Sequence, residues 1–280
     1  METQRNLESF RVFQKRIESE MMVHRIITQN EYTQWFAKGE MSLEHLKAFT
    51  VQFSVFSNLF LIAQLKKMIN AVDLNEMHKA KEILANEIGC VFKSTKVDLN
   101  ESSKSVNKEK DGDPKLVNTE GTVDGGTFRF KAAHFEWLLK FAKPLGLEFK
   151  HLGKRSHGSK STLHFCDELD RLYGNEDFNI AAGASFAVEN WAAAGFWKEL
   201  YQGLEHFRED QSLKLPLGFF TWHDKVEDQH KEDTIEELED LYFGEHDFNE
   251  DVFMESGLEM LDGVAHFWDG LNEQRVEESN

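Results

Sequence analysis

Proline is scarce in this chain. Its 280 residues include only Pro114, Pro144 and Pro216. Because proline interrupts helices from within, so few of them in so long a chain favour a mostly helical protein. Alternation of apolar and polar residues, the pattern of a half-buried strand, does not extend over any useful length. No repeat recurs at a fixed period either, which excludes solenoids and propellers. We therefore predict an all-α fold.

Cysteine is almost as scarce. The two cysteines, Cys90 and Cys166, cannot form a disulfide framework, and they suit a reducing compartment. The first residues lack the apolar core of a signal peptide. The longest apolar stretch, Val51 to Leu65, is interrupted by polar residues and is too short to span a bilayer. We expect a soluble cytoplasmic protein without a membrane partner.

Positive charge is in deficit. There are 32 lysines and arginines against 50 acidic residues, which gives a net charge of −18. Phosphate backbones and anionic lipids repel such a chain, so nucleic acid is not an expected partner. The charge can also serve solubility alone. Hydrophobic residues make up 40% of the chain, enough for a packed core. The length allows one large domain or two small ones, and because no linker is visible we predict a single domain over residues 1–280.

Apolar residues at helical spacing recur along the chain. They predict helices over residues 7–28, 30–37, 43–71, 76–88, 130–141, 162–173, 176–207, 216–242 and 248–271. The helix over residues 43–71 is apolar on most sides, which is typical of the middle of a bundle. Residues 93–127 are polar and poor in apolar side chains, so we interpret them as a loop or insertion between core helices. Such a segment could be a lid, but a surface insertion is the preferred interpretation.

One helical stretch carries the clearest chemical motif. His223, Glu227 and His230 stand at positions i, i+4 and i+7, within about 60° of one another on one helix face. Two imidazoles and a carboxylate form a coordinating edge for iron, manganese or zinc. The alternative is a solvated acidic helix that carries two histidines by chance.

Three other residues are candidate ligands, and each has a simpler explanation. Glu87 stands near a helix end, where it could be a surface acid. His134 opens a later helix and could be a hydrogen-bonded core histidine. Glu189 lies among apolar neighbours, where burial without a partner is costly, and it could pair with a lysine. Together with the histidine motif they make three carboxylates and three imidazoles, which suits iron or manganese better than structural zinc.

The order of these residues resembles that of the haem-oxygenase-like diiron oxidases, an iron-containing redox enzyme family. Its members carry a Glu, a His, a later Glu and then H-x3-[DE]-x2-H. The matching residues here are Glu87, His134, Glu189, His223, Glu227 and His230. The stretches 137–147, 197–204 and 260–271 are also similar to family segments. The resemblance extends from about residue 40 to the C-terminal helix.

The resemblance implies a seven-helix bundle that binds two ferrous ions, with manganese as the alternative metal, through these six residues. It further implies O2, a small-molecule substrate and an external electron donor as partners, and a homodimer as a possible assembly. Family chemistries include N-oxygenation of amines, C–C cleavage of amino acids and oxidative decarboxylation of fatty acids. Two departures stand out. The 93–127 insertion separates Glu87 from His134, and Val51 to Leu65 lacks the extra carboxylate that some members carry.

Two other functions remain open from the sequence. One is a metal-free enzyme on the same bundle, of the TenA/PqqC-like kind, which would not need both His223 and His230 on one face. The other is a non-catalytic acidic helical protein that binds a partner through its insertion. Iron binding distinguishes the three functions.

Overall fold

The computed structural model describes residues 5–94, 117–123, 126–244 and 246–278. Within 91–94, 117–123, 126–131 and 226–236 it describes the course of the backbone only. The helices and strands are α1 (Leu7–Arg16), α2 (Arg25–Thr28), α3 (Glu31–Phe36), α4 (Leu43–Ile69), α5 (Leu74–Glu87), β1 (Cys90–Ser94), β2 (Val117–Val123), β3 (Gly126–Lys131), α6 (His134–Ala142), α7 (Lys160–Glu168), α8 (Phe178–Ala192), α9 (Phe196–Asp210), α10 (Gly218–Phe243) and α11 (Glu250–Glu278). Single π-helical turns follow α1 and α7, over Ile17–Met21 and Leu169–Tyr173.

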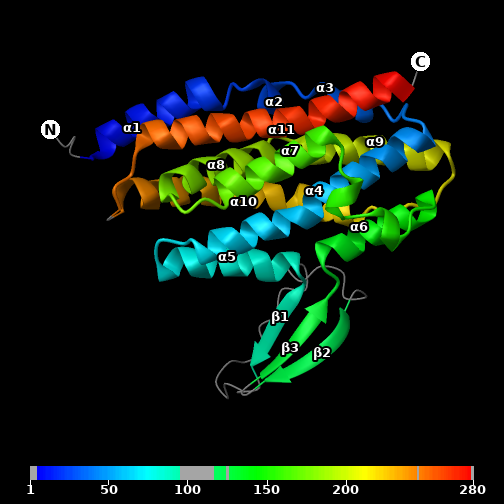
Figure 1. The fold of residues 1–280 in the computed structure, drawn as a ribbon, viewed down its shortest axis with the longest axis horizontal. Helices are drawn as coiled ribbons and strands as arrows, with labels where there is room; N and C mark the ends of the chain where they lie inside the picture. The colour runs from blue at the N-terminus through cyan, green and yellow to red at the C-terminus, as the bar shows by residue number, and fades with distance from the viewer. Residues whose placement is uncertain (1–4, 95–116, 124–125, 245, 279–280) are drawn as a thin grey trace.

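The prediction of an all-α bundle is confirmed (Figure 1). Most predicted helices are found, and several begin at the expected caps. The Ser42 hydroxyl accepts a hydrogen bond from the His45 amide at 3.1 Å, and the Asp73 carboxylate accepts one from the Glu76 amide at 2.9 Å. These bonds satisfy amides that have no partner inside the helix. With short helices such as α2 and α3 included, the described residues contain more α-helices than the seven that the resemblance implies.

One predicted helix is two. The sequence predicted continuous helix over residues 176–207, but α8 ends at Ala192 and α9 begins at Phe196. Gly195 between them has φ of +97°, a left-handed conformation that glycine adopts without steric cost. The alanines before it favour helix and conceal the break. The turn redirects the chain so that Phe196 stacks on Trp191, with ring centroids 4.6 Å apart.

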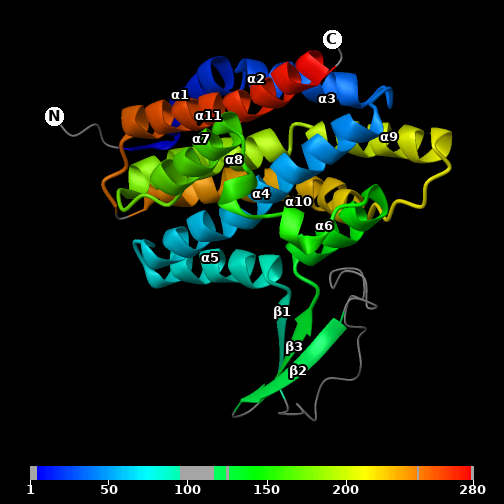
Figure 2. The same ribbon diagram turned by 45° about the vertical axis from the view of Figure 1, so that its right-hand side comes forward.

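The sequence predicted a polar loop or insertion over residues 93–127, but it did not predict the strands that the described residues in and around this segment form. β1, β3 and β2 form an antiparallel sheet in that order, with Cys90 opposite Phe130 and Thr122 opposite Thr127. The sheet stands away from the bundle next to α5 and α6, as the turned views show (Figure 2). Because β1 and β3 are neighbours, the chain leaves the bundle and returns to it at nearly the same point.

Helix α4 forms the centre of the core. Phe49 and Phe53 are fully buried on it, and the ring of Phe53 lies 5.7 Å from that of Trp197 and 6.1 Å from that of Phe219. Burying one such ring stabilises the fold by about 1.5–3 kcal/mol. By length and composition α4 could cross a membrane, but half of its apolar window is buried inside the bundle. This burial and the ring contacts of Phe53 are typical of a core helix of the bundle.

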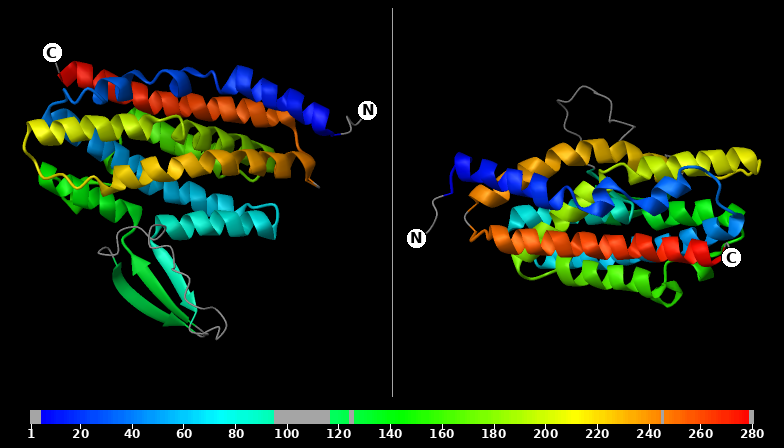
Figure 3. Two further views of the ribbon diagram at one scale, coloured as in Figure 1. Left: turned by 180° about the vertical axis from the view of Figure 1, so that it is seen from behind. Right: turned by 90° about the horizontal axis from the view of Figure 1, so that it is seen from above.

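Helices α8 and α11 pack closely along their length (Figure 3). A Cβ added at Gly183 of α8 would overlap the Phe253 carbonyl and the Ser256 hydroxyl of α11. Glycine at this position therefore sets the distance between the two helices.

We expect Gly183→Ala to lower the free energy of unfolding by about 1–3 kcal/mol, because backbone and side chain must move to admit the methyl group. Urea denaturation followed by circular dichroism measures the effect. Gly218→Ala is the matched control, because a Cβ at Gly218 meets open space. Equal stability of the two variants would contradict the prediction.

Candidate metal centre

Glu87 and His134 meet although 46 residues separate them in the sequence. Glu87 is the last residue of α5, and His134 is the first residue of α6. Their neighbours Cys90 and Phe130 are paired across β1 and β3, which holds the two helix ends together. His134 Nδ1 lies 2.9 Å from Glu87 Oε2. The insertion thus closes on itself and leaves the two side chains in contact.

The His134 imidazole is deeply buried, with 5% of its residue surface exposed. Its Nδ1 makes no hydrogen bond of acceptable geometry to any described residue, despite the short distance to the Glu87 carboxylate. A buried polar atom without a hydrogen bond is costly and rare. The His134 nitrogen and the Glu87 oxygen lie close enough together to bind the same cation.

His223 of α10 lies next to His134. The rings of His223 and His134 approach edge to face, with centroids 4.9 Å apart. His223 Nδ1 lies 2.7 Å from the Phe219 carbonyl oxygen. Because a carbonyl only accepts, Nδ1 must carry the proton, which makes Nε2 the nitrogen with the lone pair. This tautomer is the one that a metal-binding histidine needs, with its other nitrogen fixed by a backbone carbonyl.

Aromatic side chains enclose the two imidazoles. Trp197 stacks on His223 at 4.3 Å, and Trp222 meets His134 edge to face at 4.6 Å. Phe219 lies 4.4 Å from His223. An apolar wall around a polar centre restricts water and strengthens electrostatic interactions inside it.

The remaining predicted ligands divide into two groups. Glu227 and His230 lie on α10, one and two turns after His223, so the expected helix is present and the three positions share one face. The side chains of Glu227 and His230 lie outside the described residues. Glu189 lies on α8 and lines a neighbouring cavity. Among the side chains that are described, no three His, Cys, Asp or Glu residues stand in a ligating arrangement.

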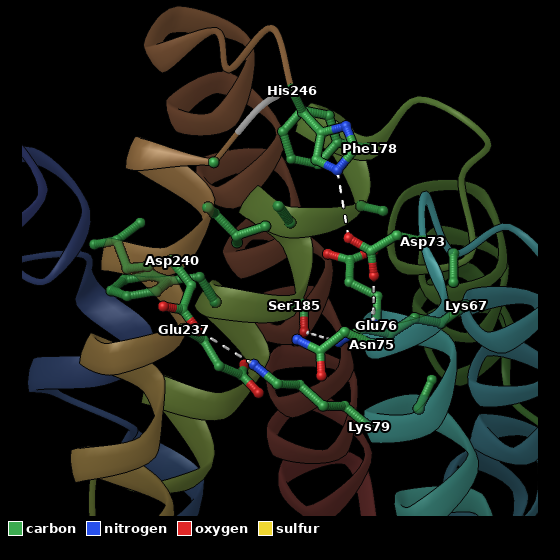
Figure 4. Close-up of a pocket in the computed structure, with 18 of the residues that line it drawn as sticks. Lys67, Asp73, Asn75, Glu76, Lys79, Phe178, Ser185, Glu237, Asp240 and His246 are labelled. Atoms are coloured by element: carbon green, nitrogen blue, oxygen red, sulfur yellow. Dashed lines mark hydrogen bonds and ion pairs between the residues drawn. The ribbon is translucent and has the colours of Figure 1, made fainter. Parts of the chain in front are cut away.

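A cavity of about 550 Å³ has Glu189 on its wall, and Figure 4 shows other residues that line it. Its walls come from the end of α4, from α5, α8 and α10, and from the loop after α10. Ile83 is the last α5 residue on the wall, and the next position on that helix face is Glu87. Glu189 is the one candidate ligand with a described side chain that lines the cavity, whereas Glu87, His134 and His223 do not line it.

Comparisons with known proteins show the fold. A crystal structure of a CADD-like protein of unknown function from Nostoc punctiforme PCC 73102 matches with a TM-score of 0.60 and 14% identity, over 98% of each chain. A domain of unknown function with a heme oxygenase-like fold from Shewanella denitrificans OS217 matches with a TM-score of 0.57 and 12% identity, over 97% of this chain and 94% of that one. No protein-family model and no curated protein matches.

The fold is haem-oxygenase-like. The solved structures share the bundle over almost its whole length, including the helices that carry the candidate ligands. Neither of these proteins has an assigned function. At 12–14% identity the likeness establishes the architecture and not the chemistry.

Lys67 is a site residue that sequence reasoning missed. It lies near the end of α4, where a lysine is expected simply to complement the helix dipole. In the haem-oxygenase-like bundle its ammonium donates to the Ser185 hydroxyl at 2.6 Å and lies 4.9 Å from the centroid of the Tyr173 ring. The charge of Glu189 raises the pKa of Lys67. Lys67 is therefore a candidate for the lysine partner of Glu189 that the sequence left open.

Carboxylates keep Lys67 charged. Burial is the largest single influence on its pKa and acts to lower it. The attraction of negative groups outweighs burial, namely Tyr173 where it is ionised and the carboxylates of Glu237, Glu189 and Glu76, so the pKa of the ammonium lies above its ordinary value. Burial raises the pKa of the neighbouring Tyr173 hydroxyl. At neutral pH this part of the cavity wall therefore carries an ammonium and a neutral phenol.

Iron fits the residues of the cluster. Its donors are imidazole nitrogens and carboxylate oxygens, the set that iron and manganese accept. Cys166 lies on α7, which carries none of these residues, and burial raises the pKa of its thiol to about 12. The buried His134 nitrogen without a hydrogen bond, next to the Glu87 oxygen, is the feature that a shared metal ion would explain.

Proposed function

We propose that this protein is a non-haem diiron oxidase or oxygenase that uses O2 to oxidise or cleave a small metabolite. The observation that supports the proposal is the convergence of Glu87, His134 and His223, with the Nδ1 of His134 buried and not hydrogen-bonded. Three separate helices contribute these residues, as in carboxylate-bridged metal sites of helical bundles.

Six residues would hold two ferrous ions, with manganese as the alternative metal. They are Glu87, His134, Glu189, His223, Glu227 and His230. When bound, the iron pair would supply the electrons and the coordination positions for O2 activation. An external electron donor would return the site to the ferrous state.

The chain's own residues have distinct tasks in this proposal. The Phe219 carbonyl fixes the His223 ring and its tautomer through the 2.7 Å hydrogen bond to Nδ1. Trp197 and Trp222 restrict water around the two imidazoles. The cavity beside Glu189 would admit the organic substrate. These are the contributions that a protein makes to a metal-based oxidation: geometry, open positions and a shaped cavity.

Anaerobic titration with ferrous iron tests the proposal. We expect about two ferrous ions per chain, because six ligands suffice for a pair of metal ions. Oxygen added to the loaded protein should produce an absorbance change that the metal-free protein lacks. Binding of less than one ion per chain would contradict the proposal, as would unchanged binding in the His223→Ala and Glu189→Ala variants. Turnover of a substrate without iron would instead indicate the metal-free TenA/PqqC-like kind.

A further inference from the structure

The cavity that Glu189 lines has a distinct composition. Its volume of about 550 Å³ lies within the range of small-molecule sites. The rings of Phe178, Phe186 and Phe253 line it, together with aliphatic side chains such as Ile83 and Leu238. Phe186 and Phe253 contact each other, with centroids 5.5 Å apart. These rings make an apolar wall for the body of a ligand.

The charges on the cavity wall are unbalanced. Five carboxylates line it against two lysines, which leaves three negative charges in excess when His246 is neutral. The carboxylates belong to Asp73, Glu76, Glu189, Glu237 and Asp240. Even with Glu189 assigned to the metal, two negative charges remain in excess. Figure 4 shows carboxylates from α5 and α10 on opposite sides of the same space.

Neither lysine is placed to receive an anion. Lys79 Nζ lies 3.7 Å from Asp240 Oδ2. Lys67 donates to Ser185 and is attracted by Glu76, Glu189 and Glu237. A carboxylate ligand would have to approach these ammonium groups among five carboxylates, which repel it. A cation meets attraction from both sides of the cavity.

We infer that this cavity is the substrate pocket and that it takes a primary amine with an apolar body. The ammonium would lie among the carboxylates of α5 and α10, and the carbon chain would lie against the phenylalanine rings. That the bound amine is oxidised rests on the proposed function, but that the cavity binds an amine does not. Within the oxidations open to the iron centre, it selects an amine substrate and excludes a fatty acid.

Calorimetric titration of the metal-free protein tests the inference, with octylamine, octanol and octanoate as probes of equal chain length. We expect octylamine to bind at least about tenfold more tightly than octanoate at neutral pH, with octanol in between. The apolar wall accepts all three chains, so the order reports the charge preference of the pocket. Octanoate binding as tightly as octylamine would overturn the inference.

Variants of Glu237 test whether its carboxylate causes the preference for the amine. Glu237→Gln should weaken octylamine binding by about tenfold, and Glu237→Lys should reverse the preference in favour of octanoate. Glu209→Gln is the matched control, because Glu209 is exposed on α9 and remote from the cavity wall. Circular dichroism verifies that each variant is folded. An octylamine affinity that is the same in all three variants would overturn the inference.

Iron titration of the same samples separates the two proposals. Amine binding without iron binding would support the amine pocket and contradict the proposed oxidase. Iron binding without an amine preference would support the proposed oxidase and contradict the inference of an amine substrate.

Discussion

Replacing His134 by alanine abolishes the stabilisation of the protein by ferrous iron. His134 is buried, and its Nδ1 faces the Glu87 carboxylate at 2.9 Å without a hydrogen bond. A ligand that binds only the folded state stabilises it by about 2.7 kcal/mol at a hundred times its dissociation constant. We expect the wild-type protein to gain stability of this order under anaerobic ferrous iron, and His134→Ala to gain almost none. Thermal unfolding with and without the metal measures the difference.

Two controls separate ligation from folding. His164→Ala removes an exposed histidine of α7 and should keep the full metal-dependent stabilisation. Glu87→Gln keeps the shape of the carboxylate but removes its charge, and should lose much of the stabilisation while the metal-free protein unfolds normally. If His134→Ala lowers stability equally with and without iron, the residue is structural and the candidate metal centre is wrong.

Replacing Phe53 by alanine lowers the free energy of unfolding by about 3–5 kcal/mol, the usual cost of removing a buried phenylalanine. Its ring has no exposed surface and contacts rings of α4, α9, α10 and α11. The cavity left behind cannot collapse easily, because these helices are held by many other contacts. Urea denaturation measures the loss.

Phe149→Ala is the matched control for this prediction. Phe149 is 60% exposed, so its removal should cost less than about 1 kcal/mol. Similar losses in the two variants would contradict the assignment of α4 as the centre of the core. Phe53→Ala should also weaken iron binding, because Phe53 contacts both Trp197 and Phe219, which enclose His223.

The sequence resemblance implied the fold of this chain at a level of sequence identity that is very low. The solved structures with the haem-oxygenase-like fold share only 12–14% of residues with this chain, and no family model matches. The all-α class nevertheless follows from local features: the few prolines, the helical spacing of apolar residues, and caps such as Ser42 and Asp73. Helical propensity and capping act over one or two turns, so a single sequence contains them.

The motif on α10 was predictable for the same reason. His223, Glu227 and His230 share a face because the helix period places them there, and α10 is a continuous helix over these residues. Whether they hold metal together with Glu87, His134 and Glu189 stays a prediction that the iron titration tests.

Tertiary structure decided what depends on distant partners. The strands β1 and β3 pair residues 32–40 positions apart, and no local pattern predicts such pairing. That pairing brings Glu87 to His134, the step that the sequence left open. The break at Gly195 was concealed by alanines that favour helix. The role of Lys67 appeared only when α4, α8 and α10 came together, because burial and charge belong to the assembled cavity and not to any one segment.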